Sequence, residues 1–97
     1  MKPKIGRVVY TVNTSYAEIS EEIVGYLGKD TFIVSNFENY NTDYEFAYDS
    51  YGATWFTSFD KAKSYLKKAF KRAYPNDKFK LDCIHDVFTG GRFWRIV

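Results

Sequence analysis

The cysteine and the histidine of this chain, one of each, are the first candidates for chemistry. Cys83 and His85 stand two positions apart in a strand-like run, so both side chains are expected on one face of a strand. A thiol beside an imidazole can form a nucleophile–base pair or supply two metal ligands. Zinc needs three or four ligands, and the sequence carries no motif for an oxyanion site. We therefore expect no metal, no cofactor and no enzyme, with a buried Cys83 beside a half-buried His85.

Three closely spaced glutamates are the second candidate. Glu18, Glu21 and Glu22 contain enough carboxylates for acid–base chemistry, but no partner motif accompanies them. We interpret them as a solvent-facing strand surface with a bulge near Glu21 and Glu22. The pair Gly90-Gly91 lacks the further glycines and the lysine of a phosphate-binding loop, so it predicts a turn.

Basic residues on a predicted helix form the third candidate. Lys61, Lys67, Lys68, Lys71 and Arg72 spread over its outward arc. Like charges four residues apart cost a helix roughly 0.2–0.5 kcal/mol per pair. Burial of the apolar arc, the acidic residues of the N-terminal half, or an external anion must outweigh that cost. These five residues are the candidate partner-binding site, and a solvated lysine face is the interpretation that we favour.

The net charge of +2 is unevenly distributed along the chain. Residues 1–60 carry four basic and nine acidic side chains, a net charge of −5, whereas residues 61–97 carry ten and three, a net charge of +7. This asymmetry indicates an anionic partner for the basic half, or neutralisation between the two halves in the folded domain. The small positive total argues against an acidic mimic of DNA.

Length and composition predict a single domain over residues 1–97, with one core. Aromatic residues make up 21% of the chain, more than such a core needs, so some of the nine tyrosines are expected at the surface. Exposed tyrosine is typical of contact surfaces, although tyrosine also fills strand positions. We expect no internal disulfide, no membrane span and no signal peptide, and a location in the cytoplasm.

The element that positions the basic residues is an amphipathic helix expected over residues 59–73. Its apolar arc consists of Phe59, Ala62, Leu66, Ala69, Phe70 and Ala73. Thr57 and Asp60 form a start signal of the capping-box type, and Pro75 ends the helix because its ring cannot continue it. The pattern predicts that Phe70 is buried.

Alternating polar and apolar residues predict strands elsewhere. The expected segments are 4–12, 18–27, 31–37, 43–48, 53–56, 78–88 and 92–97, with a loop at 38–42. A four-residue turn at 49–52 would make a central hairpin, in which Phe46 lies opposite a buried Trp55. Gly90-Gly91 would close the last hairpin and place Asp86 opposite Arg95.

Residues 51–56 (Tyr-Gly-Ala-Thr-Trp-Phe) and 57–63 (Thr-Ser-Phe-Asp-Lys-Ala-Lys) resemble a motif of small uncharacterised proteins of Gram-positive bacteria and their phages. In those proteins a curled sheet similar to an SH3 barrel leads through a Tyr-Gly-x-Thr-Trp-Phe strand into a helix that begins Ser-Leu-x-x-Ala-Lys. The likeness covers roughly residues 5–70 and departs at Phe59, where leucine is commoner. It implies a fold and no chemistry.

The expected fold class is α+β: a small, strongly curved antiparallel sheet (an SH3-like barrel), one amphipathic helix and a C-terminal β-hairpin. The expected function is that of a non-enzymatic binding protein acting by protein–protein contact. The phage-like resemblance implies a narrower version, an inhibitor of a host system such as an anti-CRISPR. The alternative is a nucleic-acid-binding module that uses the basic helix 58–74 and exposed aromatic residues. Binding that weakens steeply with salt would favour that alternative.

Overall fold

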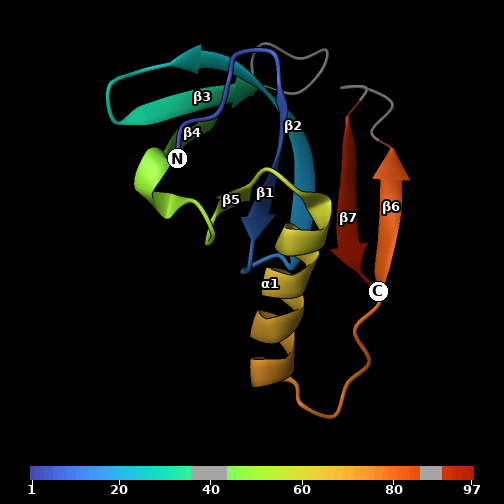
Figure 1. The fold of residues 1–97 in the computed structure, drawn as a ribbon. Coiled ribbons are helices and arrows are strands. Elements are labelled where there is room, and N and C mark those ends of the chain that lie inside the picture. Colours follow the sequence, from blue (N-terminus) through green and yellow to red (C-terminus); the bar gives the residue numbers. More distant parts are fainter. Residues whose placement is uncertain (36–43, 86–90) are drawn as a thin grey trace.

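A computed structural model describes residues 1–35, 44–85 and 91–97, so the predicted loop at 38–42 lies outside the described residues. Within them the elements are β1 (Val8–Asn13), β2 (Glu18–Leu27), β3 (Thr31–Ser35), β4 (Tyr44–Ala47), the 3-10 helix η1 (Tyr48–Ser50), β5 (Trp55–Phe56), α1 (Phe59–Ala73), β6 (Leu81–His85) and β7 (Arg92–Ile96). The strands join in one antiparallel sheet in the order β4-β3-β2-β1-β5, with β7 also paired to β2 and β6 paired to β7 (Figure 1). The sheet curls into a half-barrel, which confirms the predicted α+β class.

The long strand β2 lies at the centre of the curled sheet and pairs with three other strands. Along one edge it pairs with β1 from Glu18 to Ile23. Along the other edge it pairs with β7 as far as Ser20 and with β3 from Ile23 onward. The sheet therefore forks between Ser20 and Ile23, where β7 and β3 leave β2 in different directions (Figure 1).

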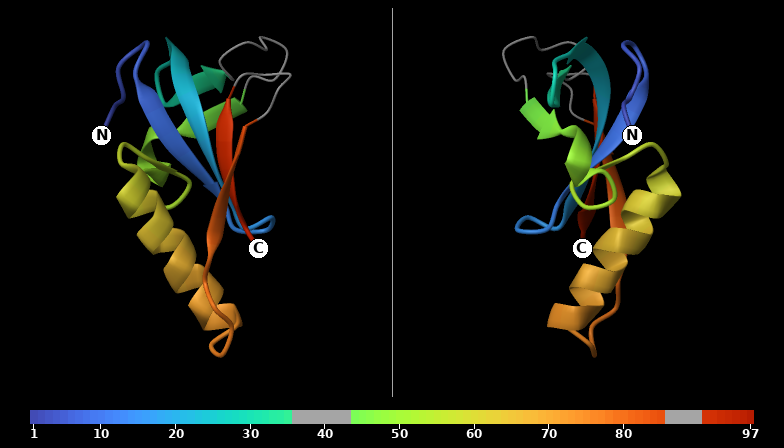
Figure 2. Two further views of the ribbon diagram at one scale, coloured as in Figure 1. Left: turned by 90° about the vertical axis from the view of Figure 1, so that its right-hand side faces the viewer. Right: turned by 60° about the vertical axis from the view of Figure 1, so that its left-hand side comes forward.

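A β-bulge helps to bend β2. The register between β2 and β3 shifts between Val24 and Tyr26, which places the bulge at Gly25 and not near Glu21 and Glu22 as predicted. A bulge increases the bend and twist of a strand. As a result, β3 and β4 lie across β1 and β2 and close one half of a barrel (Figure 2).

The predicted central hairpin over residues 43–56 is wrong, because its two strands have different partners. β4 pairs with β3 and β5 pairs with β1, so Phe46 and Trp55 do not lie opposite each other. The turn η1 carries the chain between them. It is fixed by Tyr48, whose hydroxyl donates a hydrogen bond of 2.7 Å to the carbonyl of Gly28.

The first core lies inside the curl. Trp55 is fully buried there, as predicted, and its indole N–H donates to the carbonyl of Ala47 at 3.0 Å. The Trp55 ring meets Phe32 edge-on, with centroids 4.8 Å apart. The other buried members of this cluster are Val9, Val24, Val34 and Tyr48.

The second core lies between the sheet and α1, which has the predicted bounds. Ser58, and not Thr57, caps the helix, since its side-chain oxygen accepts a hydrogen bond of 3.5 Å from the N–H of Lys61. Leu66 is 1% exposed, whereas Phe70 is only half-buried, which corrects the prediction of a buried Phe70. Leu66 belongs to a cluster with Val12, Ile19, Phe56 and Ala62.

The C-terminal hairpin forms as predicted, but in a different register. Arg95 lies opposite Asp82 instead of Asp86. The predicted turn at Gly90-Gly91 lies partly outside the described residues, and His85 lies opposite Arg92 instead of Ile96. β7 also pairs with β2, and no local turn signal in the sequence predicts that pairing.

Leu66→Ala is expected to lower the free energy of unfolding by about 2–5 kcal/mol, because it opens a cavity at a fully buried position. Phe70→Ala should cost less, although it removes more atoms, because Phe70 is half-buried near the end of α1. Urea unfolding followed by circular dichroism compares the two variants. A larger loss of stability in the Phe70 variant would contradict the observed packing of α1.

Candidate functional site

Cys83 and His85 lie at the surface and not in the core. Both lie on β6, which in the described part of the sheet pairs with β7 alone, and both side chains are exposed. The predictions of a buried thiol and a half-buried imidazole are wrong because β6 is an outer strand and not a core strand. No group of three or more His, Cys, Asp and Glu side chains that could hold a metal ion occurs among residues 1–35, 44–85 and 91–97.

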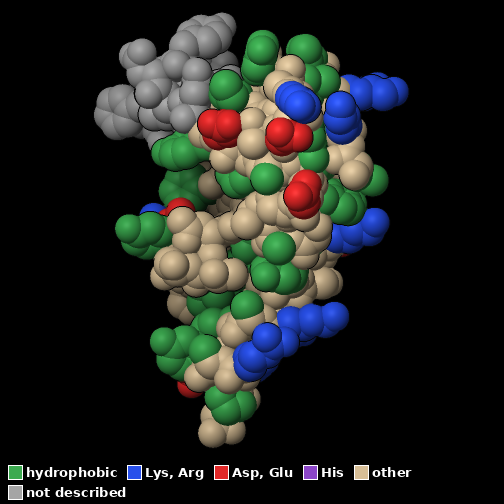
Figure 3. All heavy atoms as spheres, turned by 90° about the vertical axis from the view of Figure 1, so that its left-hand side faces the viewer, with side chains coloured by type: hydrophobic (Ala, Val, Ile, Leu, Met, Phe, Trp, Pro, Cys, Tyr) green, Lys and Arg blue, Asp and Glu red, His purple; other side chains and the backbone are tan. Residues whose placement is uncertain are grey.

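The five basic residues of the predicted site are divided over the surface of α1. Lys61 and Lys68 line one hollow. A second hollow, of about 510 Å³, is lined by lysines from α1 and from the segment before β6: Lys67, Lys71, Lys78 and Lys80. Arg72 is exposed and lines neither hollow. Lysine and arginine side chains accordingly follow one margin of the molecule over α1 (Figure 3).

Acidic residues of the N-terminal half pair with the C-terminal hairpin instead. Arg95 donates two hydrogen bonds, of 2.8 and 3.0 Å, to one carboxylate oxygen of Glu18. Arg92 binds both carboxylate oxygens of Glu21, at 2.6 and 3.1 Å. The charge asymmetry of the sequence is thus partly neutralised within the fold, without the helix lysines: in the described part of the chain, no ion pair involves α1.

Glu21 lies on the helix side of the sheet and is 8% exposed. Besides Arg92, its carboxylate accepts a hydrogen bond of 3.3 Å from the hydroxyl of Tyr10. Burial and the neighbouring Glu21 carboxylate raise the pKa of Tyr10, and the hydrogen bond to Glu21 raises the pKa of Arg92. Glu21 therefore ties β7 to β1 and β2.

Glu22 faces the opposite side of the sheet, inside the curl. It is 4% exposed, and this desolvation raises its pKa from the ordinary 4.5 to about 7. The predicted solvent-facing surface is thus wrong for Glu21 and Glu22 alike, because neighbouring elements cover both faces of β2 at the fork.

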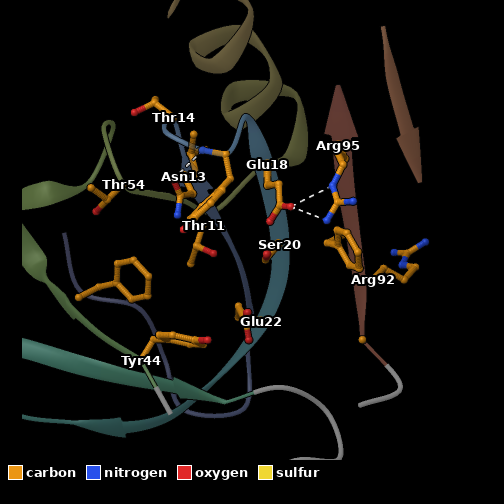
Figure 4. A pocket seen from close by; sticks show the side chains of 15 residues that line it. Thr11, Asn13, Thr14, Glu18, Ser20, Glu22, Tyr44, Thr54, Arg92 and Arg95 are labelled. Atoms are coloured by element: carbon orange, nitrogen blue, oxygen red, sulfur yellow. Dashed lines mark hydrogen bonds and ion pairs between the residues drawn. The ribbon is translucent and has the colours of Figure 1, made fainter. Parts of the chain in front are cut away.

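The inside of the curl continues beyond the first core as an open pocket of about 540 Å³. Its floor is polar and comes from β1 and β2, with Thr11, Ser20 and Glu22. Aromatic side chains from two other strands form its walls: Tyr44 and Phe46 of β4, and Phe93 of β7. Figure 4 shows Tyr44 reaching toward Glu22 from across the hollow, with the Glu18–Arg95 pair at the rim. Small-ligand pockets typically measure about 300–1,000 Å³, so this one can hold a side chain or a small molecule.

Sequence reasoning missed this pocket, although a part of its signal was present. Glu18, Ser20 and Glu22 alternate along β2 and therefore share a face. The sequence predicted that this face meets solvent. Its true position, inside the curl, follows from the pairing of β2 with β3 and β7, which no local pattern reports.

No protein-family model, curated protein or solved structure matches the chain. Within the described residues, no helix has the length and apolar character that a membrane crossing requires. The functional interpretation is therefore based on the geometry of the pocket inside the curl, which we call the half-barrel pocket.

Glu22→Gln is expected to remove a pH dependence of stability. The pKa of Glu22 is raised from 4.5 to about 7 in the folded protein, so its stabilising contribution is fully present below about pH 4.5 and is lost as the pH rises through about 7. The whole shift corresponds to about 3 kcal/mol. Relative to the wild type, the variant should gain stability between about pH 5 and about pH 8 in urea unfolding.

Glu45→Gln is the matched control, because Glu45 is exposed on β4 and does not line the pocket. The Glu45 variant undergoes the same change in charge. Its stability relative to the wild type should therefore differ little between about pH 5 and about pH 8. A constant difference between the Glu22 variant and the wild type over that range would contradict the raised pKa.

Proposed function

We propose that this protein is a non-enzymatic binding protein that acts by contact with another protein, and that the half-barrel pocket is its contact site. The pocket itself is the observation that carries the proposal: a hollow of about 540 Å³ with aromatic walls and a polar floor. Tyrosine and phenylalanine are enriched in protein contact surfaces. Two tyrosines that line the pocket, Tyr16 and Tyr44, are 72% and 54% exposed, so aromatic surface extends from the pocket to the outside.

Regular strands hold the side chains that such a partner would contact. Thr11 and Ser20 lie opposite each other on β1 and β2, and Phe93 lies opposite Ser20 on β7. Sites on strands are positioned more firmly than sites on loops. An inserted partner group would bury apolar area of Phe46 and Phe93 and could form hydrogen bonds with the two hydroxyls.

The non-enzymatic part of the proposal is supported by the positions of Cys83 and His85, which are exposed on β6 and do not line the pocket. A narrower form of the proposal is an inhibitor of a host system, such as an anti-CRISPR, acting in the cytoplasm. Only the resemblance of residues 51–63 to small proteins of Gram-positive bacteria and their phages supports that form. Identifying the captured partner would test it.

Binding of nucleic acid is a second candidate function, favoured by the four-lysine hollow beside α1. Lysines from two segments surround about 510 Å³ there, and Phe79 lines the same hollow. Lysines that neutralise phosphates release counterions, and an aromatic ring can stack on a base. Of the predicted contact residues, Lys67 and Lys71 belong to this hollow.

Tyr44→Ala is expected to weaken the capture of a protein partner by about tenfold or more, as truncation of an aromatic contact residue commonly does. Tagged protein is used to retain host proteins at high salt, and the dissociation constant is then measured with the purified partner. Tyr26→Ala is the control, since Tyr26 is similarly exposed (59%) but does not line the pocket. Equal capture by the wild type and the Tyr44 variant would overturn the assignment of the site.

Replacing Lys67 and Lys78 together by Gln tests the second candidate. If the four-lysine hollow contacts phosphates, the slope of log affinity for DNA against log salt should fall by about 2. Lys71 is left unchanged because its ammonium donates to the carbonyl of Asp77.

Lys61→Gln combined with Lys68→Gln changes the charge equally at the other hollow and serves as the control. An equal effect of the two double variants would indicate diffuse attraction, not a site. Failure of the wild type to bind DNA at physiological salt would exclude this candidate.

A further inference from the structure

We propose that a hollow between the N-terminal segment and the start of α1 is a further binding site, and that it takes a dianionic phosphate group. We call it the N-terminal hollow; its lining includes Lys2, Lys4, Arg7 and Thr57. Among the described residues it shares no lining residue with the half-barrel pocket, so the inference goes beyond the proposed function. Three features carry it: the concentration of positive charge, the lack of neutralising acids, and the fixed backbone that presents the charges.

Positive charge gathers in the N-terminal hollow, although the N-terminal half of the chain is acidic. Residues 1–60 carry a net charge of −5 and contain four basic side chains. Three of these four, Lys2, Lys4 and Arg7, line this one space of about 510 Å³. All three are exposed, so an anion that enters the hollow can reach them.

Acidic side chains do not neutralise these three cations. In residues 1–35, 44–85 and 91–97, no aspartate or glutamate lines the N-terminal hollow, and no ion pair involves Lys2, Lys4 or Arg7. The Lys2 ammonium lies 5.2 Å from the centroid of the Tyr48 ring. Such a contact positions a cation over the ring but leaves its net charge unchanged. An external anion is therefore the group that would compensate the charge of the hollow.

The backbone that carries the cations is fixed to the sheet. Residues 4–7 form a turn in which the N–H of Arg7 donates to the carbonyl of Lys4 at 3.1 Å. Gly6 has a φ of +82°, the positive value that the third position of a type II turn requires. On β2, Val24 accepts a hydrogen bond of 2.8 Å from the N–H of Gly6 and donates one of 3.0 Å to the carbonyl of Arg7. Figure 2 shows the N-terminal segment (blue) folding back at this turn into β1. Binding would therefore order little additional backbone.

A dianionic phosphate group fits this set of donors better than a phosphodiester does. A phosphate monoester carries a charge of about −1.5 to −2 at pH 7 and three acceptor oxygens, whereas a diester carries about −1. The guanidinium of Arg7 can bind two of these oxygens, and the lysine ammoniums can bind the third. The Thr57 hydroxyl lies 3.4 Å from the Tyr51 hydroxyl, so it can accept a hydrogen bond from Tyr51 and donate its own proton to the ligand.

The test is an NMR titration of the full chain at low salt with three probes: inorganic phosphate, Nα-acetyl-O-phosphoserine methylamide, and dimethyl phosphate, which is a diester. The first two should shift the amide signals of Gly6, Arg7 and Thr57. Dimethyl phosphate should bind at least about tenfold more weakly, because it forms fewer charge-assisted hydrogen bonds. Tighter binding of the phosphoserine probe than of inorganic phosphate would identify a phosphorylated side chain as the source of the group. Equal binding of these two would identify a free phosphate compound.

Replacing Lys4 and Arg7 together by Gln should weaken binding of the dianionic probes by at least about tenfold. Lys29→Gln combined with Lys63→Gln is the control, because both lysines are exposed, lie outside this hollow and give the same change in charge.

An equal loss in the two double variants would show diffuse attraction and overturn the site. Equal affinity for dimethyl phosphate overturns the assigned chemistry, and so does a lack of saturable binding of both dianionic probes below about 10 mM. These outcomes are distinct from a failure of the proposed function, which Tyr44→Ala tests at the half-barrel pocket.

Discussion

The structure depends on one strand, β2, being paired along both edges with three different partners. β1 follows one edge, while β7 and β3 divide the other between them. The sheet must therefore fork in the middle of β2, and both of its faces become covered there. Two consecutive glutamates stand at this fork, where successive side chains point to opposite faces. Glu21 is bound by Arg92 on one face, and Glu22 lines the pocket on the other.

The same fork explains why one side of the sheet is filled and the other is partly hollow. On the helix side, α1 supplies Leu66 to a continuous core. On the inner side, Trp55 and Phe32 fill the part of the curl that β3 and η1 close. Beyond them, no helix in the described part of the chain covers the floor, and β4 and β7 supply only the walls. The pocket is thus the unclosed part of a barrel whose other part is the core.

Features with a local cause were predictable from the sequence. The helix was predicted with its bounds because its apolar spacing and Pro75 act within a few residues, and β2 was predicted from its alternation. Features that depend on distant pairing were not. The partners of β4 and β5, the residue opposite Arg95 and the exposure of Cys83 depend on how distant strands pair. The candidate site belongs to this second group, because whether Glu22 meets solvent or a pocket depends on β3 and β7.

The distance along the chain between β2 and β7 has a consequence for folding kinetics. The ion pairs that join them span 71 and 77 residues, whereas β1, β2 and β3 are neighbours in sequence. Long loops are closed at a greater entropic cost, so strands that are close in sequence tend to pair early and β7 to dock late. Since β7 supplies Phe93, the pocket is completed only by that last docking step. A ligand that contacts Phe93 would then distinguish the fully folded molecule from a partly folded one.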